Sequence, residues 1–153
     1  MINNDVLRSV RFMLKVDDAA IAALIKLGGG EVSREDVTAY LKRDDEPGYK
    51  VCDHRVMAYF LDGLIIQRRG KDESSPPRPP ERSVTNNVVL KKLRVAFELK
   101  EDDLLGLMTA SGFEVSKPEL SALFRKPDHH NYRPAGDQFL RNFLKSLTAR
   151  VRG

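Results

Sequence analysis

The sequence predicts an all-α protein built from two tandem four-helix repeats that pack as a pseudo-twofold pair. Apolar residues recur at helical spacing, no segment alternates apolar and polar residues with period two, and the second half of the chain repeats the first. The chain has 153 residues, 41% of them hydrophobic and 31% charged, as in ordinary soluble proteins. Two repeats are too few for an open solenoid, so we expect them to pack face to face.

The internal duplication covers almost the whole chain. Residues 3–70 overlay residues 86–153 without a gap, so each residue of the first copy has a counterpart 83 positions later, and about a quarter of the pairs are identical. The overlay predicts a first helical repeat over residues 1–70 and a second over 86–153. Residues 71–85 join them and carry four of the eight prolines, which predicts an extended connector.

The first two helices of each repeat follow from caps and apolar spacing. The first begins after Asn4 or Asn87, which are good N-cap residues, and its apolar stripe includes Leu7 and Val10. The second follows an acidic pair, residues 17–18 or 102–103, because carboxylates favour the first turn of a helix. Glycines end it, at residues 28–30 in the first repeat and at Gly112 in the second.

The third and fourth helices have equally clear starts. Ser33 and Ser116 each precede an acidic residue by three positions, the spacing of a capping box. A polar loop then runs to Asp53 or Gly136. The last helix is the longest and most apolar, and we expect its residues to lie at the centre of the protein, with Phe60 and Phe143 buried.

Two kinds of polar residue are candidates for a site. Arg11, Asp45 and Tyr49 are identical to Arg94, Asp128 and Tyr132, which predicts that each Arg pairs with its Asp and pins the loop over the Tyr ring. Two symmetric ligand sites are the rival interpretation. The second kind is a row of basic residues on the first helix of each repeat, candidates for contacts to phosphate: Arg8, Lys15, Lys91, Lys92 and Arg94.

The charge and one helical pattern raise the alternative of nucleic-acid binding. The net charge is +4, and all of the excess lies in the second repeat. Residues 104–123 resemble a helix-turn-helix unit, although its turn carries about two extra residues. In the first repeat the equivalent helix opens with Glu35 and Asp36, whose carboxylates repel phosphates, so three-helix packing explains the pattern equally well.

Enzyme signatures are not found in the sequence. Glycines 28–30 lack the Gly-Lys-Ser/Thr ending of a phosphate-binding loop, and His129 and His130 lack further metal ligands at a known spacing. We therefore expect no catalytic site, no cofactor and no metal. The lone Cys52 indicates a reducing cytoplasm, and no apolar run is long enough to span a bilayer.

Several stretches together resemble a known family, the YehS-like family of bacterial proteins. They are the segments at residues 3–11, 69–74, 128–133 and 136–141, and the resemblance covers nearly the whole chain. It implies a small two-repeat cytoplasmic protein, with no assigned function and no site residues to carry over. We predict a non-enzymatic helical binding or adaptor protein, with homodimerisation as one form of partnership. The alternative is a nucleic-acid-binding protein that uses its helix-turn-helix-like repeats.

Overall fold

The fold is all-helical, as predicted. The computed structural model describes residues 1–71, 74 and 79–153, and these residues contain eight helices and no strand. Six of the fifteen residues of the predicted proline-rich connector, residues 72–73 and 75–78, lie outside them. The first repeat contains α1 (Asn3–Leu14), α2 (Asp18–Leu27), α3 (Arg34–Leu41) and α4 (His54–Arg69). The second contains α5 (Asn86–Ala96), α6 (Glu101–Ala110), α7 (Lys117–Leu123) and α8 (Asp137–Arg152).

Most helix starts match the caps expected from the sequence. Asp17, Ser33, Asp53 and Ser116 each accept a hydrogen bond from a backbone N–H of the first turn, which satisfies one of the free donors there. In the second repeat α6 begins one residue ahead of the acidic pair, at Glu101.

The predicted N-caps of the first helices are wrong. α1 already begins at Asn3, and Thr85 caps α5 by accepting a hydrogen bond from the N–H of Val88. Asn4 and Asn87 instead lie inside the first turn and are buried. They are not capping groups because their side chains bind backbone far away in the sequence.

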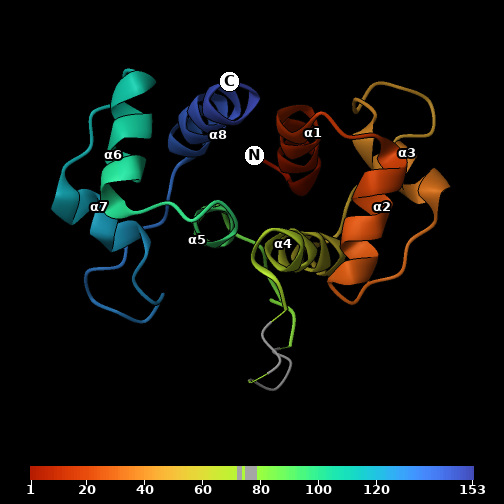
Figure 1. Cartoon of the computed structure of the whole chain (residues 1–153), viewed down its shortest axis with the longest axis horizontal. Coiled ribbons are helices and arrows are strands. Elements are labelled where there is room, and N and C mark those ends of the chain that lie inside the picture. Colours follow the sequence, from red (N-terminus) through yellow and green to blue (C-terminus); the bar gives the residue numbers. More distant parts are fainter. Residues whose placement is uncertain (72–73, 75–78) are drawn as a thin grey trace.

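The two repeats meet along two helix pairs. The last helix of each repeat packs against the first helix of the other, so that α1 lies beside α8 and α4 beside α5 (Figure 1). Exchanging the repeats turns one pair into the other, as a pseudo-twofold arrangement requires. We call these pairs the α1–α8 seam and the α4–α5 seam. In each repeat the second and third helices pack on the outside, as α2 with α3 and α6 with α7 (Figure 1).

The core runs through both repeats and the seams between them. Phe60 of α4 and Phe143 of α8 are fully buried, as expected from the last helices, and the buried residues form one continuous apolar cluster. Burying a side chain of this size stabilises the fold by about 1.5–3 kcal/mol, so the shared core holds the two repeats together.

α2 and α4 approach each other unusually closely in the first repeat. A Cβ atom on Gly63 would lie 1.8 Å from the carbonyl oxygen of Leu24, and one on Gly28 would lie 1.9 Å from that of Tyr59. Backbone therefore faces backbone at this crossing, and only glycine fits. The second repeat has Ser146 and Ser111 at the corresponding positions, so α6 and α8 cannot approach as closely as α2 and α4 do.

We expect Gly63→Ala to lower the free energy of unfolding by about 1–3 kcal/mol or more, because α2 must move away from α4 to make room. Gly106→Ala is the matched control: it also lies inside a helix, but a Cβ there meets nothing within 4 Å. It should stabilise the protein by up to about 1 kcal/mol through higher helix propensity. Urea unfolding followed by circular dichroism measures both, and equal effects would contradict the close packing.

Candidate functional site

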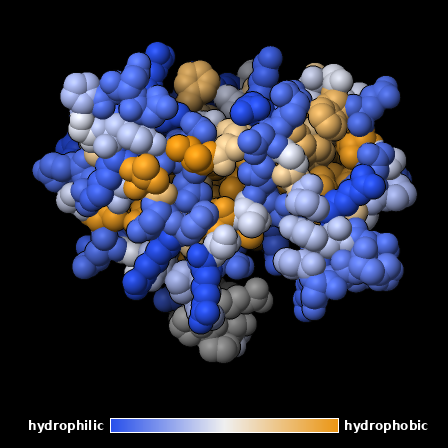
Figure 2. All heavy atoms as spheres, turned by 180° about the vertical axis from the view of Figure 1, so that it is seen from behind, coloured by the Kyte–Doolittle hydropathy of each residue, from blue (hydrophilic) through white to orange (hydrophobic). Residues whose placement is uncertain are grey.

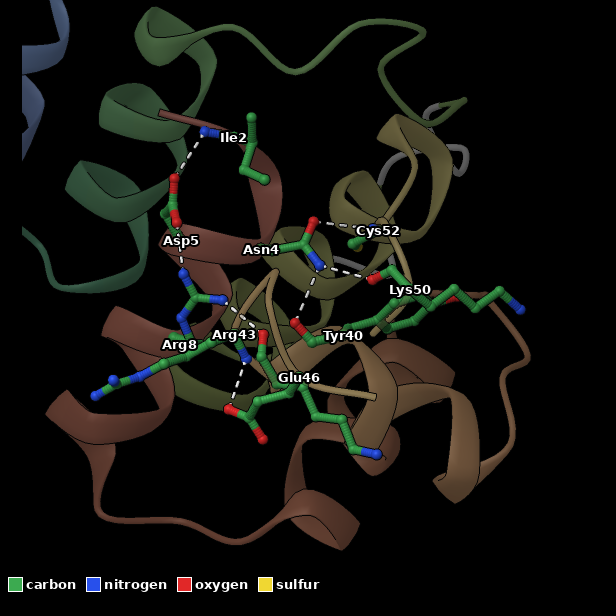
Figure 3. A network of polar contacts seen from close by, with 10 residues as sticks. Ile2, Asn4, Asp5, Arg8, Tyr40, Arg43, Glu46, Lys50 and Cys52 are labelled. Atoms are coloured by element: carbon green, nitrogen blue, oxygen red, sulfur yellow. Dashed lines mark hydrogen bonds and ion pairs between the residues drawn. The ribbon is translucent and has the colours of Figure 1, made fainter. Parts of the chain in front are cut away.

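A buried asparagine binds the loop that precedes the last helix of the first repeat. The side chain of Asn4 donates to the carbonyl oxygens of Tyr40 at 3.0 Å and Lys50 at 2.8 Å, and accepts from the N–H of Cys52 at 3.0 Å. Figure 3 shows it lying between these three backbone groups. Asn4 has no exposed surface, so its amide is a structural tie and is not available to a ligand.

The second repeat builds the same tie at the matching residues. Asn87 donates to the carbonyl oxygens of Leu123 and Arg133 and accepts from the N–H of Ala135, all between 2.8 and 2.9 Å. The preceding asparagines also correspond, since Asn3 donates to the carbonyl of Cys52 and Asn86 to that of Ala135. The identity of these residues in both repeats is the sequence signal, and it indicates a shared structural task.

The predicted pairing of Arg11 with Asp45 and of Arg94 with Asp128 is wrong. Arg11 forms its ion pair with Asp18, at 3.3 Å, and Arg94 donates to the carbonyl oxygen of Leu99, at 3.1 Å. The Arg94 guanidinium also lies over the ring of Phe124, 4.7 Å from its centroid. Both arginines thus secure the turn after the first helix.

The other residues of those predicted pairs stay apart from the arginines. Asp45 and Asp128 are exposed in turns and form no ion pair within the described residues. Tyr49 and Tyr132 are partly buried, and the backbone N–H of each closes a turn, at the carbonyls of Glu46 and His129. The structure therefore does not assemble the identical Arg, Asp and Tyr into two symmetric ligand sites.

The five predicted phosphate contacts do not form one basic face. Arg8 is held by Asp5 at 2.5 Å and by the carbonyl of Lys42, and Lys92 is paired with Asp62 at 2.9 Å. Arg94 is engaged as described above. Lys15, the C-cap residue of α1, and Lys91 of α5 remain exposed.

The α4–α5 seam is closed by charge pairs. Lys92 of α5 meets Asp62 of α4 at 2.9 Å, both partly buried, and Arg69 meets Glu98 at 2.7 Å near the ends of the helices. Arg68 adds a hydrogen bond to the carbonyl oxygen of Ala96 and lies over the ring of Phe97. Each carboxylate in this seam therefore faces a cation.

The α1–α8 seam joins the corresponding helices but lacks the carboxylates of the other seam. Arg152, which matches Arg69 in the repeat alignment, donates to the carbonyl oxygen of Phe12 at 2.6 Å and lies over its ring, 4.0 Å from the centroid. The other seam makes a similar contact from a position that does not correspond, with Arg68 over Phe97. In the repeat alignment Lys145 stands where Asp62 stands in the other seam, and Lys15 stands where Glu98 stands. Two carboxylates are thus replaced by two lysines, and this seam carries unbalanced positive charge.

A shallow groove of about 270 Å³ lies along the α1–α8 seam. Its walls are formed by Met1, Ser9, Phe12, Arg141, Leu144, Lys145 and Thr148, and a neighbouring depression extends it to Asp5 and Arg8. Neither Arg141 nor Lys145 forms an ion pair within the described residues. The nearby carboxylates are already held, Asp5 by Arg8 and Asp137 by the N-terminal amine, which lowers the pKa of Asp137.

Exposed charge beside an exposed ring makes this groove the candidate site. Phe12 is 60% exposed although it is a large apolar residue. Beside it, Arg141 and Lys145 are exposed and form no ion pair within the described residues. Sequence reasoning missed the groove because it looked for a row of charges on one helix. The sequence nevertheless carried a signal, because Lys145 of the second repeat stands at the position of Asp62 in the first.

The thiol of Cys52 does not contribute a reactive group. Burial raises its pKa to about 12, and the neighbouring Asp53 carboxylate adds to the effect. Burial likewise raises the pKa of Tyr40 to about 12. In the described part of the chain no three His, Cys, Asp or Glu side chains gather to hold a metal, and no helix there is long and apolar enough to cross a membrane.

Each repeat matches the same protein family. The family described as "Protein of unknown function (DUF1456)" matches residues 3–70 and again residues 86–153. The chain is 49% identical over 150 residues to "Uncharacterized protein YehS" of Escherichia coli (strain K12), which covers 98% of this chain and 96% of that protein. The resemblance to the YehS-like family is therefore confirmed. No solved structure matches the chain.

We expect Asn4→Ala and Asn87→Ala each to lower the free energy of unfolding by about 2–4 kcal/mol, because buried backbone groups left without a partner cost about 1–3 kcal/mol each. Asn131→Ala, at an exposed turn position, should change it by less than about 0.5 kcal/mol. Urea unfolding measures all three. Loss of stability in only one of the two buried variants would contradict an equivalent task in both repeats.

Cys52 should resist thiol-reactive disulfide reagents at pH 8 in the folded protein and react fully after unfolding in urea, because the thiolate is the nucleophile and folding disfavours it. The same raised pKa makes stability depend on pH. The unfolded thiol ionises from about pH 9, whereas the folded one does not until about pH 12, so stability falls as pH rises between these values. Cys52→Ala should weaken this decline, and fast labelling at pH 8 would contradict the burial.

Proposed function

The chain belongs to the DUF1456 family, whose domain it carries twice, and from this premise we propose that it is a non-enzymatic helical binding protein of the cytoplasm. Its binding surface is the α1–α8 groove, and its partner is anionic. The observation that carries the proposal is the difference between the seams: one neutralises its own charges, whereas the other exposes cations at the same positions.

A binding role rather than a catalytic one is supported by what the polar side chains do. Asp17 and Ser33 cap helices, Asn4 and Asn87 hold loops, and Cys52 is buried in its protonated form. These groups are committed to the fold. Arg141 and Lys145 of the groove form no ion pair within the described residues, and unpaired cations attract an anionic partner and raise its rate of association.

Charge rather than apolar area is the means of recognition. On the face seen from behind, hydrophilic side chains predominate, and hydrophobic atoms show in groups between them (Figure 2). The groove itself offers one well-exposed apolar side chain, Phe12, among Arg141, Lys145 and Arg152. A partner held mainly by charge fits this surface. Homodimerisation stays a prediction.

DNA reading by the helix-turn-helix-like pair of α6 and α7 has weaker support. α7 has seven residues, and the carboxylate of Glu119 lies at its N-terminus, where it forms the capping box with Ser116. A recognition helix places its N-terminal residues against the bases, and a carboxylate there meets the negative field of the phosphates. A depression beside α7 does contain Lys117, Arg125 and Arg133, which is what favours this second candidate.

Retention on a heparin column tests the proposal, because heparin is a soluble stand-in for a polyanion. We expect Lys145→Asp to elute at clearly lower salt than the wild-type protein, since it places a carboxylate in the groove. Lys91→Asp changes the net charge equally at an exposed position outside the groove and should shift elution much less. Equal shifts for the two variants would show that net charge, and not the groove, causes retention, and would contradict the proposal.

A further inference from the structure

The α1–α8 groove combines features that suit one particular class of anion. Arg141, Lys145 and Arg152 lie on one face of α8, the first two a single turn apart. At a rise of about 1.5 Å per residue the row is about 16 Å long. Such a row suits an extended chain of regularly spaced negative charges better than a single small anion.

Phe12 adds a contact that charge alone does not supply. Its ring is 60% exposed and lies at the groove, and the Arg152 guanidinium over it fixes its orientation. An exposed aromatic ring beside a basic track is the arrangement on which unpaired bases stack. The bases of a duplex are already stacked and do not present their faces to such a ring.

We propose that the α1–α8 groove binds single-stranded nucleic acid, with phosphates along Arg141 and Lys145 and a base stacked on Phe12. The proposal rests on the proposed function and names its partner. An acidic peptide fits less well, because an amphipathic helix needs a continuous apolar floor for residues one turn apart. In this groove Leu144 is buried, which leaves Phe12 as the exposed anchor among the lining residues.

The comparison between the seams supports this assignment. The α4–α5 seam has Asp62 where the groove has Lys145, and Glu98 where Lys15 lies in the α1–α8 seam. Those carboxylates would repel a phosphate backbone. Ser9 likewise stands at the position of Lys92. The double variant Ser9→Lys with Lys145→Asp therefore introduces the ion pair of the α4–α5 seam into the groove. The new pair should close the groove with the same contact that Lys92 and Asp62 already make in the fold.

The main experiment is fluorescence anisotropy of the full-length protein with a labelled twelve-residue oligothymidylate at low salt. The double variant should weaken binding at least about tenfold, and Lys91→Asp should change it little. Phe12→Ala should weaken binding about 5- to 150-fold, the range for loss of one base stack. The slope of log affinity against log salt should be less steep by about 0.7 for each phosphate contact removed.

A second measurement reports stacking directly. The chain contains no tryptophan, so Phe12→Trp introduces a single indole at the groove. Oligothymidylate should quench its fluorescence, whereas a polyglutamate peptide should not. Circular dichroism of every variant checks that the helices are intact.

The outcomes separate this inference from the proposed function. No binding of oligothymidylate at low salt, no quenching of the introduced tryptophan, or stronger binding of the matching duplex would overturn the inference. If Lys145→Asp still lowered heparin retention selectively, the groove would remain a binding surface for another anionic partner. If it did not, both would fall.

Discussion

A buried asparagine in each repeat is the interaction on which the rest of the structure depends. The loop between the third and fourth helices carries backbone N–H and C=O groups that no helix satisfies, and a buried backbone group without a partner is costly. Asn4 satisfies two of them, at Lys50 and Cys52, together with the carbonyl of Tyr40 near the end of α3. Asn87 does the same in the second repeat. The loop can therefore lie against the first helix, and this contact fixes where the last helix begins.

The position of the last helix then determines how the repeats meet. α4 and α8 each run from an anchored loop to the first helix of the other repeat, and they carry Phe60 and Phe143 in the shared core. The arginine near the end of each, Arg68 or Arg152, closes the seam by donating to a carbonyl of that helix and covering a phenylalanine ring. One local tie, used twice, thus brings corresponding helices together in both seams, although the two arginines stand at positions that do not correspond in the repeat alignment.

The buried contacts of the two repeats correspond, whereas the more exposed contacts of the two seams differ. The ion pairs of the α4–α5 seam are at most partly buried, and a pair near the surface contributes little to stability, so exchanging a carboxylate for a lysine there costs the fold little. Asp62 and Lys145 occupy the same place on the same scaffold, but one is neutralised and the other faces solvent. A duplicated protein can in this way keep one seam as structure and make the other a binding surface.

The sequence by itself determined the local structure and the duplication. Caps such as Ser33 and Ser116, the apolar stripes and the glycine stops act over three or four residues, so their meaning does not depend on distant parts of the chain. The gap-free repeat also indicated the paired arrangement. Only the tertiary structure decided which polar residues meet. Asn4 binds backbone groups 36 to 48 positions away in the sequence, and Arg11 pairs with Asp18 and not with Asp45. Helix packing determines which of these groups lie close together in space. The groove is likewise a property of two helices from opposite ends of the chain, and neither helix alone contains it.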